Sequence, residues 1–431
     1  MKKKLIAMLL LCSCAVSLCF GGCTQRVTSD IPVTEEPPVT AEPYEPEWLI
    51  SPTQNDADQT VTDAYLTLSA NLARMNYQQN KNMLVSPASI EFALGMALAG
   101  AEGETLAQMN RVLGNTASRE EILDFCQSYQ EQLADGKDSP FKVANSIWVN
   151  ENVITGSLKK SYTSTLEEVF HAESYREPFT DATKDKINKW CSKNTDKMIP
   201  EILKKMNPAS AAFLINAICF DANWAEPYEE YQVEEDVFHN EDGTESTVDF
   251  MHEDMNTYYE IDNACGFCKY YEDYDYAFLA ILPDKNVGLE QFLGDFDADT
   301  YRDFMASETG EYLVSTQLPK FSSDYSVNAN DQLKALGITD AFVNGLADFS
   351  GIIDKSDNNL FIDTVIHKTH VEVNENGTKA AAVTMIEMTD GLCAPMDEPE
   401  WREVHLNRPF LYMIIDTETE MPVFIGTVNQ F

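Results

Sequence analysis

Basic residues are scarce in this chain of 431 residues, which has 30 Lys and Arg against 71 Asp and Glu and a formal net charge of −41. Such a chain repels phosphate backbones, and no basic stripe with interleaved aromatic residues offsets the repulsion, so nucleic-acid binding is not expected. Solubility through mutual repulsion explains the charge most simply. Electrostatic steering of a basic protein partner is the alternative interpretation.

Motifs of the common enzyme classes are missing as well. The chain contains no G-x-S-x-G, H-E-x-x-H, P-loop or G-x-G-x-x-G sequence. His367 and His370 are three apart, and on a strand this spacing directs them to opposite faces, where they cannot share a metal. Cys265 and Cys268 have zinc or redox spacing but lack a second Cys or His pair at zinc-site spacing. We therefore predict no catalysis, metal site or cofactor, and leave a local Cys265–Cys268 disulfide open.

Long apolar runs are absent except at the N-terminus. Residues 2–4 are lysines, residues 5–20 are apolar apart from Ser and Cys, and two glycines precede Cys23. This order predicts a secretory signal peptide over residues 1–22, and hence an extracytoplasmic protein. Cys23 resembles the lipidated first residue of a bacterial lipoprotein, which would anchor the chain in a membrane at the cell surface. An ordinary signal peptide with an incidental Cys is the alternative, because Phe20 stands where Leu is usual.

The composition changes twice along the chain. Residues 23–60 alternate Pro with Glu, which predicts an extended, solvated tether because proline favours extended backbone and like charges repel. Residues 61–431 are uniformly globular, with no internal repeat and no second linker. They predict a single domain, larger than most.

Hydrophobic spacing within the domain predicts a mixture of helices and strands. An apolar stripe from residue 64 favours a helix. Ser86 is a good N-cap, Pro87 suits a first turn, and the following helix is apolar on all sides and therefore buried. Strands are predicted at 143–149, 213–220, 276–282, 312–318 and 409–415. Without a βαβ rhythm, these elements indicate an α+β fold with large, mainly antiparallel sheets.

The most informative segment is 367–400. It begins as a strand at 367–373 and turns at 374–377. Residues 378–388 then alternate: one face is uncharged and small at its leading end, whereas both charges lie on the other face. Such a segment can enter a sheet as a strand with one buried face. The bland alternative is an ordinary strand followed by an ordinary loop, which starts after Met388. The residues of the uncharged face are Thr378, Ala380, Ala382, Thr384, Ile386 and Met388.

Eight motifs across the domain resemble those of the serpin family, and they occur in that family's order with similar spacing. Together they cover essentially all of residues 61–431. The motifs begin at Ser86 (SPASI), Gly100 (GAEGET), Ala144 (ANSIW), Leu214 (LINAICFDANW), Leu318 (LPKF), Ala347 (ADFSGI), His367 (HK) and Arg408 (RPFL).

The resemblance implies the serpin fold: three β-sheets, about nine helices and an exposed reactive-centre loop. It also implies a protease inhibitor. A target protease cleaves the loop and is trapped covalently while the loop inserts into the central sheet. The alternative is a serpin scaffold that binds a partner without inserting. Six hinge residues keep the inhibitory pattern, which favours the inhibitor, whereas Lys379 and Val383 depart mildly from it. These hinge residues are Glu375, Gly377, Thr378, Ala380, Ala381 and Ala382.

The same resemblance assigns further sites. Four residues match the polar latch beneath the middle of the central sheet, namely Ser86, Ser89, Asn216 and His367, and Trp224 matches the aromatic residue where insertion starts. Lys197 stands where Gly is usual. The family's spacing from Glu375 places the scissile bond between Gly391 and Leu392. This pair suggests elastase-, subtilisin- or chymotrypsin-like serine proteases, or papain-like cysteine proteases, as partners of a monomeric inhibitor.

Overall fold

The computed structural model describes residues 61–134, 139–354, 360–378 and 400–431, which all belong to one compact unit. The predicted signal peptide, the tether and Cys23 lie outside the described residues, as do Ala380, Ala381, Ala382 and the Gly391–Leu392 bond.

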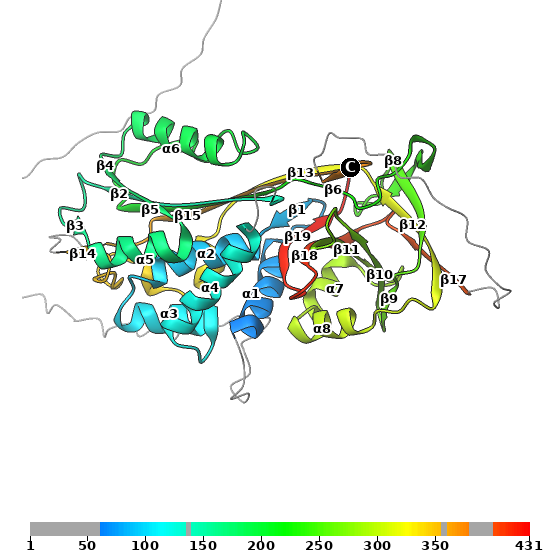
Figure 1. The fold of residues 1–431 in the computed structure, drawn as a ribbon, viewed down its shortest axis with the longest axis horizontal. Helices are drawn as coiled ribbons and strands as arrows, with labels where there is room; N and C mark the ends of the chain where they lie inside the picture. The colour runs from blue at the N-terminus through cyan, green and yellow to red at the C-terminus, as the bar shows by residue number, and fades with distance from the viewer. Residues whose placement is uncertain (1–60, 135–138, 355–359, 379–399) are drawn as a thin grey trace, which may run out of the picture. The chain divides into compact units, whose positions relative to one another are not determined.

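Nine α-helices occur in the described residues, several of them in the N-terminal half of the domain (Figure 1). They are α1 (Val61–Asn76), α2 (Pro87–Leu98), α3 (Gly103–Gly114), α4 (Arg119–Ala134), α5 (Lys160–Phe170), α6 (Asp181–Asn194), α7 (Leu289–Asp295), α8 (Ala298–Ala306) and α9 (Asn330–Ala335). Local sequence accounts for α2: the Ser86 side chain caps it by accepting from the Ser89 N–H, and Pro87 occupies the first turn. All twelve residues of α2 are buried, as its apolar pattern predicts.

Three large sheets make up most of the remaining structure. The central sheet contains β4 (Glu173–Glu177), β2 (Phe141–Asn150), β5 (Ala212–Phe220), β15 (Thr364–Asn374), β13 (Phe321–Asn328), β16 (Gly377–Thr378) and β6 (Ala222–Asn223). The core sheet has the order β1 (Met83–Val85), β19 (Pro422–Val428), β18 (Phe410–Asp416), β11 (Tyr276–Pro283), β10 (Ala264–Tyr270) and β9 (Tyr259–Ile261). The third sheet has the order β17 (Glu400–His405), β12 (Tyr312–Pro319), β8 (Glu245–Met255) and β7 (Val233–His239). A two-stranded ladder joins β14 (Ile353–Asp354) to β3 (Ser157–Leu158).

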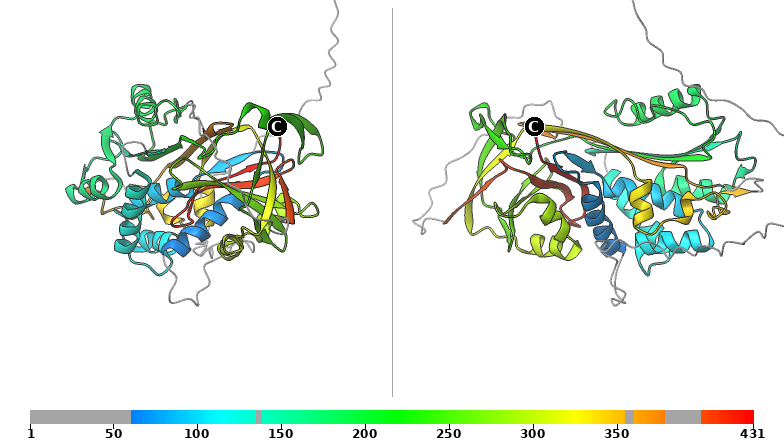
Figure 2. Two further views of the ribbon diagram at one scale, coloured as in Figure 1. Left: turned by 45° about the vertical axis from the view of Figure 1, so that its right-hand side comes forward. Right: turned by 180° about the vertical axis from the view of Figure 1, so that it is seen from behind.

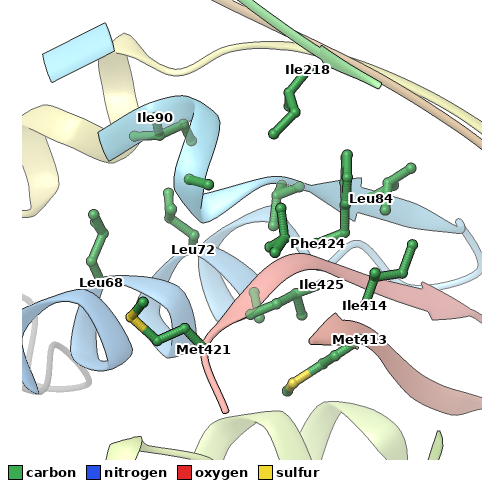
Figure 3. Close-up of a cluster of buried hydrophobic side chains, with 14 of the residues drawn as sticks. Leu68, Leu72, Leu84, Ile90, Ile218, Met413, Ile414, Met421, Phe424 and Ile425 are labelled. Carbon is green, nitrogen blue, oxygen red and sulfur yellow. The ribbon is translucent and has the colours of Figure 1, made fainter. Parts of the chain in front are cut away.

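Helices cover both faces of the central sheet, and the two further views agree on this arrangement (Figure 2). On one face α6 packs Ile187 and Trp190 against Trp148 and Phe213. On the other face α2 lies beneath β5 and leads into the main core. Figure 3 shows part of that core, where side chains of α1, α2, β1, β5, β18 and β19 meet; they include Leu72, Leu84, Ile90, Ile218, Ile414 and Phe424.

The predicted fold class is confirmed: the protein is α+β, with three large sheets and nine helices in the described residues. The five predicted strands correspond to β2, β5, β11, β12 and β18, and the predicted strand at 367–373 lies within β15. None of the described helices is both long and apolar enough to span a bilayer.

Candidate functional site

The two middle strands of the central sheet, β5 and β15, run parallel and pair over only part of their length. Their pairing is confined to Phe213–Ile215 of β5 and Thr364–Ile366 of β15. Beyond it, within the described parts of the chain, residues 216–220 of β5 pair with β2 alone, and residues 367–372 of β15 pair with β13 alone. The two facing edges form what we call the lane. Such unpaired edges are a template for an added strand.

A buried hydrogen-bond cluster lies where the lane begins, next to the β5–β15 pairing. We call this the lower end of the lane, and the end near residues 374–378 the upper end. His367 of β15 is 1% exposed, and its Nε2 accepts the Ser86 N–H at 3.0 Å. Because Nε2 accepts, Nδ1 carries the proton and donates to Ser89 Oγ at 3.3 Å. Burial lowers the pKa of His367 to about 4, so the imidazole is neutral at physiological pH. The first turn of α2 is thereby fastened to the strand that borders the lane.

Asn216 borders the opposite edge of the lane and bonds to a different partner. Its Nδ2 donates to Asn145 Oδ1 at 2.5 Å, and Asn145 in turn donates to Gln130 Oε1 at 2.7 Å. The Asn216 side chain is 2% exposed, yet its Oδ1 finds no hydrogen-bond partner among the described residues. The structure thus joins Ser86, Ser89 and His367 directly, while Asn216 is bonded to β2. A buried carbonyl oxygen without a hydrogen-bond partner destabilises the folded state, so a donor placed beside Asn216 Oδ1 would stabilise it.

The upper end of the lane is closed by the turn at 374–377. The Trp224 N–H donates to the Asn376 carbonyl and its indole Nε1 donates to the Asn374 carbonyl, both at 2.9 Å. Lys320 Nζ lies 3.0 Å from the Glu375 carboxylate. A hydrogen bond from its own backbone N–H, together with the Lys320 ammonium, holds the pKa of Glu375 below its ordinary value. Trp224 and Lys320 therefore hold the turn at 374–377 in place.

Two loop residues already occupy the upper end of the lane. Gly377 and Thr378 pair with Asn223 and Ala222 of β6 on one side, and with the end of β15 on the other. A Cβ atom at Gly377 would lie 2.1 Å from the Ala222 carbonyl oxygen, so only glycine fits there. Thr378 is fully buried, and its Oγ1 lies 2.6 Å from the Tyr271 hydroxyl. Gly377 and Thr378 thus form a short strand between β6 and the end of β15.

One further group near this site was not predicted from the sequence. Glu91, in the second turn of α2, is fully buried, and neither carboxylate oxygen has a hydrogen-bond partner among the described residues. The groups that interact with it electrostatically are Tyr65 of α1 and Cys126 and Tyr129 of α4. Burial raises the pKa of Glu91 to about 8. A single acidic residue in an otherwise apolar helix was the available signal.

The cysteines and acidic residues form no metal site in the part of the chain described here, where no group of three His, Cys, Asp or Glu could hold an ion. Cys265 and Cys268 lie on β10 and are free thiols, as are the buried Cys126 and Cys191. Residues three apart on a strand point to opposite faces, which keeps Cys265 and Cys268 from forming a disulfide.

Comparison with known proteins identifies the family. The model of the Serpin (serine protease inhibitor) family matches residues 63–431. The chain therefore belongs to the serpin family, whose members are mostly protease inhibitors rather than enzymes.

Individual relatives agree with this assignment. The chain is 33% identical over 362 residues to Iripin-5 of Ixodes ricinus, covering 81% of this chain and 89% of that protein. It is 30% identical over 358 residues to a serine protease inhibitor of Cyanea capillata, covering 81% of this chain and 92% of that protein. Among solved structures, the thermophilic serpin tengpin in its native state is similar with a TM-score of 0.80 and 36% identity, covering 88% of this chain and 96% of that one.

Proposed function

We propose that this serpin inhibits its target protease by suicide cleavage of the reactive loop. The protease's serine oxygen attacks the Gly391 carbonyl carbon, the bond to the Leu392 nitrogen breaks, and the proton of the hydroxyl passes to the leaving amine. Gly391 is then held as an ester, or as a thioester if the target is a cysteine protease. Insertion of the freed loop into the lane distorts the protease before water can hydrolyse that bond. The observation that carries the proposal is the pairing of Gly377 and Thr378 at the upper end of the lane, between β6 and the end of β15.

Register supports the lane as the destination of the loop. Thr378 pairs with Val373 of β15 and with Ala222 of β6. Continuing both antiparallel registers downward by equal steps brings Thr384 opposite His367 on one side and opposite Asn216 on the other. The Thr384 hydroxyl would thus arrive beside the Asn216 Oδ1 that lacks a donor. The two registers together place Thr384 between His367 and Asn216, which favours insertion over an unrelated use of the loop.

Alternation supports the same orientation. Thr378 is buried, so the residues that share its face of an extended strand point inward when the loop inserts. These are the uncharged Ala380, Ala382, Thr384, Ile386 and Met388, whereas Lys379 and Glu387 point outward. The loop can therefore enter the sheet without burying a charge.

The test is complex formation. The chain lacking its first 22 residues would be incubated separately with elastase-, subtilisin-, chymotrypsin- and papain-like proteases, then analysed on denaturing gels. We expect a band at the summed mass with at least one protease, and a released C-terminal peptide whose mass identifies the scissile bond as Gly391–Leu392. Loop cleavage by every protease without a covalent band would reject the inhibitor and favour a serpin scaffold that binds a partner without inserting.

A matched pair of loop variants makes this test specific. Thr384→Arg would drive a charge into the lane at His367 and Asn216, whereas Met385→Arg places the same charge on the outward face. We expect Thr384→Arg to be cleaved as a substrate and Met385→Arg to retain the complex. Equal behaviour of the two variants would contradict the proposed register.

We also propose that the inhibitor is a monomer held at the bacterial cell surface through lipidated Cys23, with residues 1–22 removed and 23–60 serving as the tether. The support is the order of lysines, apolar run and small residues before Cys23, followed by the Pro/Glu-rich segment. Detergent phase partition tests the anchor: the wild-type chain should enter the detergent phase and Cys23→Ser should not. An unchanged partition would leave an ordinary secreted protein.

A further inference from the structure

Tyr271 lies beside the two loop residues in the upper end of the lane. Its side chain is 1% exposed. The ring stacks on the Trp224 indole, with centroids 4.5 Å apart and planes 14° apart, and it meets the edge of Phe220 at 4.7 Å. Its backbone forms an isolated β-bridge to Trp224. Packing from two sides and a backbone bridge therefore fix the direction of the Tyr271 hydroxyl.

That hydroxyl points at the hinge. It lies 2.6 Å from Thr378 Oγ1, and both side chains are excluded from water. Burial raises the pKa of Tyr271, so the group remains a neutral hydroxyl. Breaking a hydrogen bond between two buried hydroxyls leaves both without a partner unless the loop moves out into water. Release of Thr378 from the lane therefore requires loss of this bond.

We infer that Tyr271 is a positioning residue that keeps Thr378 in the lane and so provides the seed from which the loop strand grows. This inference rests on the proposed inhibitory function. Adding a strand is slowest at its first pairs, because these pairs restrict the loop before later pairs contribute. With Thr378 already paired, insertion extends an existing ladder. Since Thr378 keeps its place as the ladder lengthens, the bond to Tyr271 persists in the inserted state.

The seed affects the two steps of inhibition differently. Cleavage of the loop by the protease does not need it, whereas insertion before deacylation does. Removing the Tyr271 hydroxyl should therefore lower the fraction of cleavage events that end in a covalent complex, without slowing cleavage itself. A general loss of folding would reduce both quantities, so the split distinguishes a positioning role from a structural one.

The first measurement is hydrogen exchange of the backbone amides in peptides covering 374–382, in the chain without its first 22 residues. Tyr271→Phe keeps the ring and removes the hydroxyl, and Thr378→Val removes the other partner. We expect each variant to exchange roughly five- to tenfold faster there, as expected for loss of one buried hydrogen bond. The double variant should be no faster than either single one. Tyr270→Phe, next to Tyr271 but on the opposite face of the chain, should match wild type.

Unchanged exchange in both Tyr271→Phe and Thr378→Val would overturn the inference, and Thr378→Val serves if Tyr271→Phe fails to fold. The second measurement is the number of loops cleaved per covalent complex, using elastase or chymotrypsin. We expect this number to rise several-fold in Tyr271→Phe at an unchanged cleavage rate. Faster exchange without a change in the number of loops cleaved per covalent complex would overturn the seeding role. If the wild-type chain forms no complex, the proposed function fails, while the exchange result still decides whether Tyr271 holds Thr378.

Discussion

Replacing Glu91 with glutamine should make the stability of this serpin much less dependent on pH. In the unfolded chain the carboxyl ionises near its ordinary pKa of 4.5, whereas burial in α2 raises that pKa to about 8 in the folded chain. Between these values the folded chain retains a proton that the unfolded chain has lost. Rising pH therefore favours unfolding over this range, and the effect levels off above pH 8.

The magnitude follows from the pKa difference. Each pH unit between 4.5 and 8 lowers the free energy of unfolding by about 1.4 kcal/mol, which amounts to about 3 kcal/mol by pH 7. This is a large part of the roughly 5–15 kcal/mol that stabilises a typical domain. Glutamine has nearly the same shape and cannot ionise. The free energy needed to bury the glutamine amide at this position is therefore the same at every pH.

Urea unfolding of wild type, Glu91→Gln and the control Glu104→Gln at pH 5, 6, 7 and 8 measures the effect. Between pH 5 and pH 8, we expect the free energy of unfolding of Glu91→Gln to rise by about 4 kcal/mol relative to that of wild type. Glu104 is exposed on the neighbouring α3, so its variant should follow wild type. Parallel curves for wild type and Glu91→Gln would refute the conclusion that burial keeps the Glu91 carboxyl neutral.

Three further predictions concern the lane and the turn at Lys197. Burial lowers the pKa of His367 from 6.5 to about 4, so the free energy of unfolding of wild type should fall by about 3 kcal/mol as the pH drops between these values. Acid unfolding should show no such fall in His367→Gln. Gly377→Ala should displace the hinge from the Ala222 carbonyl and reduce covalent complex formation on gels; wild-type amounts would contradict the fit. Lys197 has a φ of +70°, a backbone conformation that is strained for any residue with a Cβ atom. Lys197→Gly should therefore raise the free energy of unfolding by about 1 kcal/mol in urea titrations, and a lower free energy of unfolding would contradict this explanation.

Local signals predicted the elements that frame the lane. The cap at Ser86, the apolar run of α2 and the alternation of β15 depend on neighbouring residues, so they are readable from the sequence. By contrast, β7 and β8 were not predicted. β7 carries several exposed acidic residues, and its pattern lacks a buried face, because it is an edge strand stabilised by pairing with β8.

The details of the site were beyond sequence reasoning because they depend on distant contacts. Tyr271 and Thr378 are 107 residues apart in the chain, and nothing near either residue indicates their hydrogen bond. The bond between Asn216 and Asn145 depends on the register of β2 against β5, which no local pattern fixes. The resemblance to serpins supplied the candidate residues, and the structure supplied their partners.

The position of β19 has a consequence for synthesis of the protein. This final strand lies between β1 and β18, and all seven of its residues are buried. Met83, near the start of the domain, therefore pairs with Thr427, almost at its end. The core sheet cannot close before residues 422–428 have left the ribosome, so β1 and β18 must wait for a strand that is made more than 300 residues after Met83.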